Sequence, residues 1–518
     1  MTQTNDTQRL TSDSREHLAA LDLGSNSFHL IIGRVIEGQI QPIHKFKQRV
    51  SLAEGLVNKG ISVEAFDRGL DALSQFAMHL RDFAPERVRV VATHTLREAN
   101  NRKEFIQAAR QLLPFPIEVI SGREEARLIY LGVAQAVPFR GVRLIIDIGG
   151  GSTEFAVGHA EEPEILLSKS FGSLVVSERF FAKGKVTPKR FNKAVLSVKQ
   201  ELEPFSKQLK KARAEQVLGT SGTIKALAKW IHGSTDGDLT ITLKALHQLR
   251  DRLLTLRHIS EINSSDVEQQ RIPSIVGGLA VLIAVCEEIG IDELSSVDAA
   301  LREGVLFELA EQAVFHKDIR YKTIQSMAVR YQVDEAQAKR VLSSAELILE
   351  GVGNTWQLNT PDIRLLLAGA CSLHEVGMNI SSSGIQKHSG YILANAYMPG
   401  FSSDEQRVLA MLCRYYRKKI IAEELTDFAQ FEHFTVARMI VVIRLAVLLN
   451  ASRQTHEALR SVSLKGAKLI LTLQGPLAKS AILESHESLI AACNEVDPIL
   501  VKFGGGCRDL EVRVIDTE

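Results

Sequence analysis

LIIDIGGGSTE, residues 144–154, is the stretch from which the fold is predicted: a short apolar run, an acidic residue and three consecutive glycines. This pattern is typical of a buried strand that ends in a phosphate-binding turn. Glycine tolerates positive φ and lets backbone N–H groups approach an anion without a Cβ in the way, and hydroxyl groups add further donors. We therefore expect an anion site at Gly149, Gly150, Gly151, Ser152 and Thr153.

A similar stretch occurs earlier in the chain. AALDLGSNSF, residues 19–28, again has an Asp at the end of an apolar run, before the turn residues Gly24, Ser25, Asn26 and Ser27. A glycine turn after a strand most often only reverses the chain, so either stretch by itself predicts little. As a pair they indicate two related half-domains that face each other and hold a phosphate ester between the two turns. A third small-residue turn, expected to be a further anion or ligand loop, comprises Ser221, Gly222 and Thr223.

Composition and charge exclude several classes of protein. At 518 residues the chain is longer than a single core supports, so two to four domains are expected. Lys and Arg number 62 against 61 Asp and Glu, a net charge of +1, so no whole-protein field attracts nucleic acid and we expect no nucleic-acid partner. The five cysteines show no C-x-x-C spacing, which argues against a zinc site or a disulfide framework and fits a reducing cytoplasm.

The chain is expected to divide into an α/β part, an all-α part and a small α+β end. Strand and helix patterns alternate up to about residue 313, and amphipathic helices follow, the first of them expected at residues 329–351. The longest apolar run, residues 275–285, is too short to span a bilayer. The predicted segments are a flexible tail at 1–16, an N-terminal lobe at 17–136, a second lobe at 137–313, a helical domain at 314–455 and a small α+β domain at 456–518.

Three carboxylates accompany the two glycine turns. Asp22 and Asp147 end the two predicted strands, and Glu154 follows the triple glycine. Carboxylates alone would repel a phosphate, but Mg²⁺ between them would attract it, because magnesium prefers oxygen ligands and keeps waters that bridge to phosphate. A lone Asp at such a position more often caps its own turn. The matched set favours a metal site at Asp22, Asp147 and Glu154.

The candidates for a general base are Glu124 and Glu125. An S-x-x-E capping box predicts a helix that starts at Ser121, and Glu124 is its third residue. There the carboxylate can accept the backbone N–H of Ser121, so a structural role is favoured for Glu124. Glu125 is left free to polarise a water for attack on phosphorus. The ordinary alternative for Glu125 is an acid that stabilises the helix dipole by ~0.3–1 kcal/mol.

Positive charge for the phosphate is expected from Arg97. It follows the predicted strand at 88–92, and its guanidinium could bind phosphate oxygens bidentately. Three basic strings are further candidates, although each by itself is more often a solvated face. Together they could line a path for an extended polyanion. The strings are Lys45, Lys47 and Arg49; Lys207, Lys210, Lys211 and Arg213; and Arg414, Arg417, Lys418 and Lys419.

Six segments in a fixed order resemble those of the exopolyphosphatase/guanosine pentaphosphate phosphohydrolase family, over nearly the full length of the chain. The resemblance implies two ribonuclease-H-like lobes of the actin, sugar kinase and chaperone ATPase type around a phosphate cleft. It also implies a helical domain of HD-phosphohydrolase type and a homodimer. The segments are DLGSNSFH at 22–29, THTLR at 93–97, ISGREEARLI at 120–129, DIGGGSTE at 147–154, SGTIK at 221–225 and LREG at 301–304.

The resemblance also implies an activity. The family removes the terminal phosphate of inorganic polyphosphate processively, as a phosphoric anhydride hydrolase that uses Mg²⁺ and is commonly stimulated by K⁺. By its pattern Glu125 is the catalytic base, and Asp147, Gly149 and Glu154 belong to the phosphate and metal loop. The His-Asp pair of the HD type reads His374-Glu375 here, which argues against a second metal centre. A cytoplasmic location is expected, with peripheral attachment to the inner membrane left open.

Four features look more like polyphosphatases and favour polyphosphate over guanosine pentaphosphate as the substrate: His94, the triple glycine, Ile224-Lys225 and the segment RYYRK at 414–418. The pentaphosphate phosphohydrolases tend to have Ala in place of His94 and in place of the third glycine, Gly151. Hydrolysis of guanosine pentaphosphate in the same cleft is the alternative, and guanosine penta- or tetraphosphate could also bind as an inhibitor. Two further alternatives are a phosphotransferase between polyphosphate and ADP, which would need an adenine pocket near residues 219–223, and a non-catalytic sensor.

Overall fold

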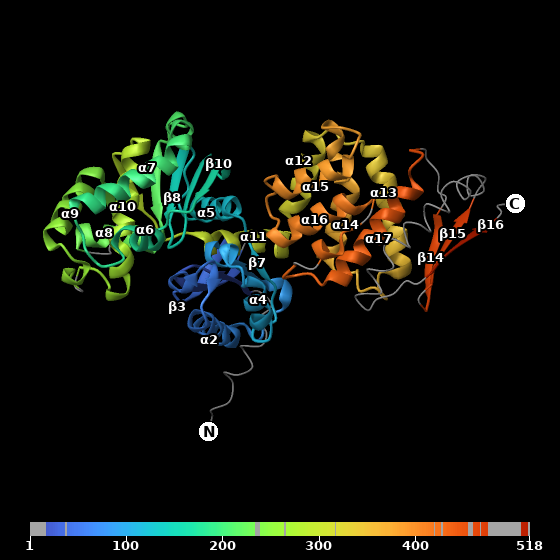
Figure 1. The fold of residues 1–518 in the computed structure, drawn as a ribbon, viewed down its shortest axis with the longest axis horizontal. Helices are drawn as coiled ribbons and strands as arrows, with labels where there is room; N and C mark the ends of the chain where they lie inside the picture. Colours follow the sequence, from blue (N-terminus) through green and yellow to red (C-terminus); the bar gives the residue numbers. More distant parts are fainter. Residues whose placement is uncertain are drawn as a thin grey trace, which may run out of the picture. The chain divides into compact units, whose positions relative to one another are not determined.

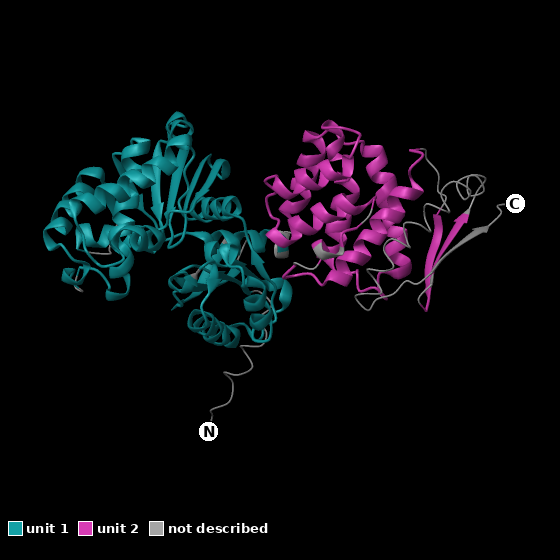
Figure 2. Cartoon of the chain, viewed as in Figure 1, with its two compact units in different colours: residues 1–317 teal, residues 318–518 magenta. Residues whose placement is uncertain are grey.

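The computed structural model divides into two compact units, residues 1–317 and 318–518, which are coloured separately in Figure 2. Each unit has its own hydrophobic core and is described by itself. The tail expected at residues 1–16 lies outside the described part of the chain. The structure describes residues 17–36, 39–233, 239–263, 266–315, 318–418, 420–425, 428–453, 459–466, 468–474 and 509–515.

The first sheet of unit 1 contains the earlier of the two Asp-glycine stretches. Its strand order is β3-β2-β1-β6-β7, with β2 antiparallel to β1 and β3, and with β6 and β7 parallel to β1. Most side chains of β1 and all of those of β6 are buried, as expected for strands covered on both faces. The strands are β1 (His17–Leu23), β2 (Ser27–Ile36), β3 (Gln39–Arg49), β6 (Val88–Ala92) and β7 (Ile117–Val119).

The second sheet repeats this layout around the later stretch. β9 is antiparallel to β8 and β10, β11 and β13 run parallel to β8, and β12 is added antiparallel at the edge. The mixed α/β class and the duplicated hairpin expected from the sequence are both present in unit 1. The strands are β8 (Val142–Ile148), β9 (Thr153–His159), β10 (Glu162–Lys169), β11 (Gln216–Thr220), β12 (Thr240–Thr242) and β13 (Glu293–Ser296).

Helices α6 to α10 gather around the second sheet, and α10 contacts each of the other four (Figure 1). α5 instead packs against β9 and β10 at the opposite edge of that sheet and against α11. The helices of unit 1 are α2 (Val63–Leu80), α3 (His94–Glu98), α4 (Arg102–Arg110), α5 (Gly122–Ala136), α6 (Ser173–Phe181), α7 (Pro188–Lys211), α8 (Ser221–His232), α9 (Leu243–Leu256), α10 (Ile272–Ile289) and α11 (Leu301–Phe315).

α10 is the central helix of the second lobe. With the short 3-10 turn η5 (Gln269–Arg271) it forms the one segment of the described residues that is long and apolar enough to cross a membrane by length and composition. In this structure 72% of its apolar window is buried inside the protein, which is typical of a core helix. Gly290 ends the helix with φ of 83°, a conformation that glycine adopts without strain.

α5 and α11 cross at two glycines. A Cβ on Gly132 of α5 would lie 2.6 Å from the backbone nitrogen of Gly304, and a Cβ on Gly304 of α11 would lie 2.7 Å from the carbonyl carbon of Leu128. Such backbone-to-backbone contact requires the absence of side chains. The sequence assigned residues 301–313 to the second lobe, whereas α11 packs against α5, β1 and β2. Sequence order alone does not show which sheet a terminal helix covers.

A buried ion-pair network ties α11 to the first sheet. Glu308 on α11 accepts hydrogen bonds from Arg89 on β6 and, at 2.6 Å, from Arg127 on α5. Arg89 also pairs with Glu118 on β7 at 3.0 Å, and Arg127 pairs with Glu124 at 2.7 Å. Burial alone would raise the pKa of Glu308, but the two guanidinium groups lower it to about 2. The Glu308 carboxylate therefore stays charged at neutral pH and holds the end of unit 1 against its beginning.

The described residues of unit 2 between 319 and 449 are mostly helical. The helix expected at residues 329–351 is found as α13, but its expected start is wrong: α12 ends at Arg330 and α13 begins at Glu335. The break follows from Asp334, whose side chain accepts the backbone N–H of Gln337 at 3.0 Å and so caps a new helix. The helices are α12 (Ile319–Arg330), α13 (Glu335–Val352), α14 (Pro361–Leu373), α15 (Ile385–Asn395), α16 (Ser403–Tyr415) and α17 (His433–Leu449).

Three strands form the last described part of unit 2. β14 (Leu459–Lys465) is antiparallel to β15 (Lys468–Gln474), which runs parallel to β16 (Asp509–Ile515). β14 packs so closely on α13 that a Cβ on Gly351 would lie 2.6 Å from the carbonyl carbon of Val462. The stretch between β15 and β16, where the helical part of the expected α+β domain would fall, lies outside the described residues.

Candidate active site

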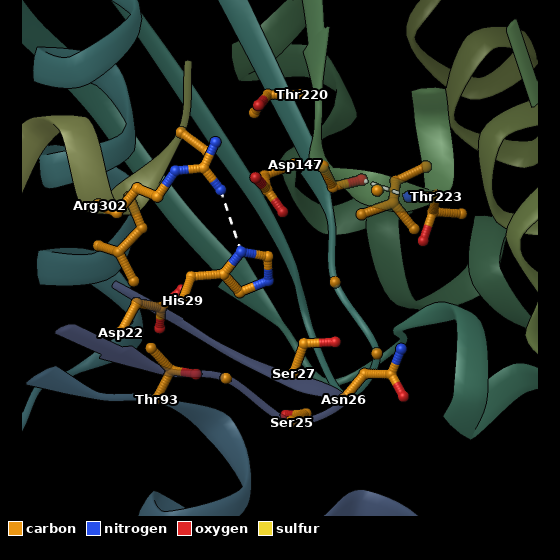
Figure 3. Close-up of a pocket in the computed structure, with 18 of the residues that line it drawn as sticks. Asp22, Ser25, Asn26, Ser27, His29, Thr93, Asp147, Thr220, Thr223 and Arg302 are labelled. Carbon is orange, nitrogen blue, oxygen red and sulfur yellow. Dashed lines mark hydrogen bonds between the residues drawn. The ribbon is translucent and has the colours of Figure 1, made fainter. Parts of the chain in front are cut away.

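The Asp-glycine turns of the two sheets line one cavity of about 390 Å³ in unit 1, drawn in Figure 3. This volume lies in the usual range for small-molecule sites, ~300–1,000 Å³. The third small-residue turn, at the start of α8, lines the same cavity. The expected site residues that line it are Asp22, Gly24, Ser25, Asn26, Ser27, Glu125, Asp147, Gly149, Gly150, Gly151, Ser152, Ser221, Gly222 and Thr223.

The two Asp-glycine turns have the same shape. A Cβ on Gly24 would lie 2.8 Å from the carbonyl oxygen of Ser27, and a Cβ on Gly149 would lie 3.1 Å from that of Ser152. In both turns the glycine is therefore tightly packed against the residue three positions later. The duplication seen in the sequence extends to the local geometry of the turns.

These glycines serve close approach rather than positive φ. No glycine of either turn has a positive φ, so the expected use of that conformation is wrong here. A Cβ on Gly150 would lie 3.5 Å from the Cβ of Ser25, so the two turns lie side by side, and Gly172 packs against the backbone of Gly150. Ser221 in the third turn does have a positive φ, 91°, and such strain in a non-glycine residue is often found at functional sites.

The three expected metal-binding acids occupy different positions. Asp22 and Asp147, at the ends of β1 and β8, both line the cavity (Figure 3). Oδ1 of Asp22 is buried and has no hydrogen-bond partner. Glu154 pairs in register with Asp147 but lies outside the cavity lining, and it accepts a hydrogen bond from Ser168 at 2.8 Å.

Burial and mutual repulsion raise the pKa of each acid in this group. Burial is the largest cause in every case. The pKa of Asp147 rises to about 7, with Glu125 as the second cause. The pKa values of Asp22 and Glu154 rise well above their usual range, and Glu125 and Asp147 contribute to both. Such a group stays fully charged only beside a compensating cation.

The acidic group fits a Mg²⁺ ion that is held partly by water. Within the described ranges, no three His, Cys, Asp or Glu side chains are arranged to hold a metal by themselves. Mg²⁺ does not need such a group, because it keeps several waters and commonly takes one or two carboxylates together with substrate phosphates. Asp22, with its unpartnered oxygen, and Asp147 could supply those carboxylates. A ligand role for Glu154 stays a prediction.

Of the two adjacent acids at the start of α5, only Glu125 lines the cavity. The hydroxyl of Ser121 caps α5 by accepting the N–H of Glu124 at 3.2 Å. The carboxylate of Glu124 accepts two hydrogen bonds from Arg127, at 2.7 and 2.9 Å. Burial raises the pKa of Glu125, an effect that Arg97 opposes. Glu125 is therefore the acid of this pair that can reach a bound water.

Two expected phosphate ligands, Arg97 and Thr153, make hydrogen bonds within the protein. Arg97 on α3 donates to Oε2 of Glu125 at 3.2 Å and to the carbonyl oxygen of Ile120 at 2.9 Å. Its guanidinium thus orients Glu125 and favours the charged carboxylate. The hydroxyl of Thr153 donates to the carbonyl oxygen of Phe171 at 2.8 Å and is fully buried. Phosphate binding by Arg97 and Thr153 stays a prediction.

The cavity also contains residues that were not assigned to the site from the sequence. Ser173, at the start of α6, bonds the carbonyl oxygen of Gly149 through its N–H at 2.9 Å and its hydroxyl at 3.0 Å. Arg302 donates to Nδ1 of His29 at 3.1 Å (Figure 3). Some of these residues lie in the segments that match the family, but Arg271 and Ser173 carry no sequence signal. The missed residues include His29, Thr93, Ser173, Thr220, Lys225, Arg271 and Arg302.

His94 explains why residue 151 is a glycine. A Cβ on Gly151 would lie 2.8 Å from Cγ of His94 and closer still to Nδ1. His94 is buried, and burial together with Arg97 lowers its pKa to about 4, so the ring is neutral. Ala at position 151 requires a smaller residue at position 94. Two of the features that favoured polyphosphate in the sequence, His94 and the third glycine, are therefore a single packing contact.

We expect Gly151→Ala to destabilise the protein by ~1–3 kcal/mol, the usual cost of overpacking. The double variant His94→Ala/Gly151→Ala should recover most of that loss, because the methyl group then occupies the space of the ring. Urea unfolding of the wild type, both single variants and the double variant measures the coupling. His159→Ala, at an exposed ring on β9, is the matched control for the loss of a histidine. A double variant no more stable than Gly151→Ala would show that the ring is not the obstacle.

In unit 2 the His-Glu pair at the expected HD position is used in packing. Nδ1 of His374 lies 2.9 Å from the carbonyl oxygen of Cys371, and its ring meets Tyr416 edge-on at 5.3 Å between centroids. Glu375 forms an ion pair with Arg453. These contacts support a structural role for the pair.

Two sheets of the same design, with paired glycine turns over a cluster of acids, define a two-lobed α/β enzyme that acts on phosphate groups. Comparison with known proteins agrees with that class. The chain belongs to the Ppx/GppA phosphatase family, which it matches over residues 31–313, and residues 319–491 match domain III of the same family. The family resemblance expected from the sequence is confirmed.

Relatives from two Vibrio species match over most of the chain, and both carry the name guanosine-5'-triphosphate,3'-diphosphate pyrophosphatase. The protein from Vibrio cholerae is 37% identical over 476 residues, 91% of this chain and 95% of its own. That from Vibrio vulnificus is 35% identical over 481 residues, 92% of this chain and 96% of its own. A solved exopolyphosphatase from Cytophaga hutchinsonii is 26% identical with a TM-score of 0.53, and the match covers 57% of this chain and 98% of that one.

Proposed function

We propose that this phosphatase hydrolyses the terminal phosphoanhydride bond of guanosine pentaphosphate, with inorganic polyphosphate as the second candidate substrate. The observation that carries the choice is the name of the relatives from both Vibrio species, which match more than nine-tenths of the chain. The relative named exopolyphosphatase supports the second candidate and matches 57% of the chain. Two of the four features behind the expected preference for polyphosphate, His94 and Gly151, are one packing contact rather than two independent signals.

The proposed reaction is attack of water on the terminal phosphorus. Backbone N–H groups of the turns at 24–27 and 149–152 would hold the terminal phosphoryl group between the two sheets. Glu125 accepts a proton from the attacking water as the new P–O bond forms and the anhydride P–O bond breaks. The leaving group departs as the shortened phosphate, and orthophosphate is the other product. Arg97 keeps Glu125 oriented through the hydrogen bond described above.

Mg²⁺ at Asp22 and Asp147 would neutralise the charge that develops on the phosphate oxygens. We expect a chelator to reduce phosphate release to background and added Mg²⁺ to restore it. In Asp22→Asn the Mg²⁺ concentration for half-maximal rate should rise by ~10-fold or more, because one charged ligand is lost. Asp67→Asn, an exposed acid on α2, is the control. An unchanged Mg²⁺ dependence in Asp22→Asn would remove Asp22 from the metal site.

The substrate is tested by orthophosphate release from guanosine pentaphosphate and from long-chain polyphosphate, at equal concentrations, with Mg²⁺ and K⁺ present. The expected result is faster release from the nucleotide, with each compound inhibiting turnover of the other. Release from polyphosphate alone would make the protein an exopolyphosphatase. Release from neither would reject the hydrolase proposal, and ATP formation from ADP and polyphosphate would point to a phosphotransferase.

The finer layout belongs to the same proposal. The strand order of each sheet supports two ribonuclease-H-like lobes, and the helices of unit 2 are compatible with an HD-like domain. Activation by K⁺, a homodimer, a cytoplasmic location and peripheral attachment to the inner membrane stay predictions. A non-catalytic sensor is disfavoured because Glu125, Asp22 and Asp147 are all present at the cavity.

A further inference from the structure

The duplicated hairpins place one side chain directly opposite each Asp. Across the first hairpin Asp22 pairs with His29, and across the second Asp147 pairs with Glu154. Side chains that are directly opposite on antiparallel strands lie on the same face of the sheet. His29 is therefore the counterpart of Glu154 in the first lobe. Unlike Glu154, His29 lines the cavity beside its Asp.

Arg302 determines which nitrogen of the His29 ring carries the proton. NH1 of Arg302 lies 3.1 Å from Nδ1 of His29, the contact drawn as a dashed line in Figure 3. A guanidinium group has only N–H donors, so Nδ1 must be the unprotonated acceptor. The ring is then neutral, and its single proton is on Nε2. Arg302 is held in turn, because its Nε donates to Glu303 at 3.0 Å.

The Nε2–H group of His29 has no hydrogen-bond partner in the described part of the chain. His29 is partly buried and lines the cavity, so this donor is open to a bound group. In the view of Figure 3 the ring lies between Asp22 and Asp147. That is the space in which the proposed reaction places the terminal phosphoryl group. An N–H donor there gains free energy by binding an anionic oxygen.

We propose that His29 is a further catalytic residue, a neutral donor that binds a non-bridging oxygen of the terminal phosphoryl group through Nε2–H, and that Arg302 is a positioning residue that holds the ring in this tautomer. The ligand rests on the proposed hydrolytic function. The hydrogen bond strengthens as negative charge grows on that oxygen during attack by water, so it favours the transition state. His29 keeps its proton throughout, and the proton of the attacking water goes to Glu125.

Matched variants at position 29 test the donor, with orthophosphate release from guanosine pentaphosphate and from long-chain polyphosphate as the measurement. Glutamine can place an amide N–H near the position of Nε2, whereas asparagine is one methylene shorter and reaches only the position of Nδ1. His29→Gln should keep kcat within about 10-fold of the wild type, and His29→Asn and His29→Ala should lower it by ~10²–10³-fold, the usual effect of removing one such donor. KM should change less than kcat, because the bond is strongest in the transition state.

The matched control is His44→Asn, at an exposed ring on β3 outside the cavity lining, which should keep wild-type kcat. Thermal unfolding shows whether each variant is folded. Folded His29→Asn and His29→Ala proteins with kcat within about 3-fold of the wild type would overturn the contact with substrate. A folded His29→Gln protein as slow as His29→Ala would overturn the donor role, because the amide donates but cannot transfer a proton.

The tautomer is tested on the wild type without turnover, by NMR of protein labelled with ¹⁵N in its histidines. The ring signals of His29 are those that disappear in His29→Gln. Near neutral pH they should show a proton on Nε2 and none on Nδ1, and the Nε2–H signal should shift when inorganic phosphate is added. A proton on Nδ1, or no response to saturating phosphate, would overturn the proposal. Since no hydrolysis is needed, this result is separable from failure of the proposed function.

Arg302→Met tests the positioning role. Without the guanidinium donor the His29 ring should populate both tautomers in the same NMR measurement, and kcat should fall by ~10–100-fold, the usual effect of losing a residue that orients another. In the His29→Gln background the same change should cost much less, because no ring is left to orient. An unchanged tautomer in Arg302→Met, or equal losses of kcat in the two backgrounds, would overturn the role of Arg302.

Discussion

Glu125→Gln is expected to reduce orthophosphate release by ~10²–10⁴-fold, the usual contribution of a positioned general base, while the protein stays folded. The amide has nearly the shape of the carboxylate but cannot take a proton from water. Glu125 lines the cavity, and its hydrogen bond to Arg97 fixes its direction. Removing its charge also lessens the repulsion on Asp22 and Asp147, so little stability should be lost.

The neighbouring acid provides the control. Glu124 is 1% exposed and bonded to Arg127, so Glu124→Gln should lower stability while the folded fraction keeps its turnover. Phosphate release and thermal unfolding are measured on both variants. A folded Glu125→Gln protein that kept more than about a tenth of wild-type turnover would contradict the assignment of the base.

Glu308→Gln is expected to destabilise unit 1 by ~3–5 kcal/mol, the usual effect of removing one partner from a buried ion pair. The variant leaves Arg89 and Arg127 buried with less negative charge between them. Urea unfolding measures the loss. Glu288→Gln is the control, because its ion pair with Lys210 is long, 3.9 Å, and half of the lysine side chain is exposed. Such pairs contribute ~0–1 kcal/mol.

The contribution of Glu308 to the free energy of unfolding should fall as the pH is lowered. Its pKa is lowered to about 2 in the folded protein, below the ~4.3 of a free glutamate. The carboxylate therefore stabilises the fold fully above the unfolded pKa and loses that effect as the pH falls toward 2. The stability difference between the wild type and Glu308→Gln should be constant near pH 7 and should shrink below about pH 4. A difference that grew on acidification would contradict the network.

The duplicated sheets could be predicted because local patterns encode them. Apolar runs that end in Asp and glycine appear twice, and each became a hairpin with a tight turn. The helix start at Ser121 and the helix end at Gly290 were also predicted from neighbouring residues, and both are found in the structure. The break between α12 and α13 was missed, although Asp334 carried a capping signal, because the apolar periodicity continues across it.

The parts of the site that were missed depend on contacts between distant segments. Glu154 is bonded to Ser168, and Arg97 is bonded to Glu125, which no spacing rule reveals. Arg271 belongs to no motif, and its guanidinium packs on Gly222 at the cavity. A sequence shows which residues can do chemistry, and tertiary packing decides which of them face the substrate.

The glycine crossing of α5 and α11 determines how this chain could be recombined with a relative. A chimaera that exchanged residues 17–136 alone would join α5 of one parent to α11 of the other, at a contact with no room for a methyl group. It would also take Glu308 from one parent and its ion-pair partners, Arg89 and Arg127, from the other. The unit of exchange is therefore discontinuous, residues 17–136 together with 301–315. Exchange of this pair keeps the glycine crossing and the Glu308 network within one parent, whereas exchange of residues 17–136 alone does not.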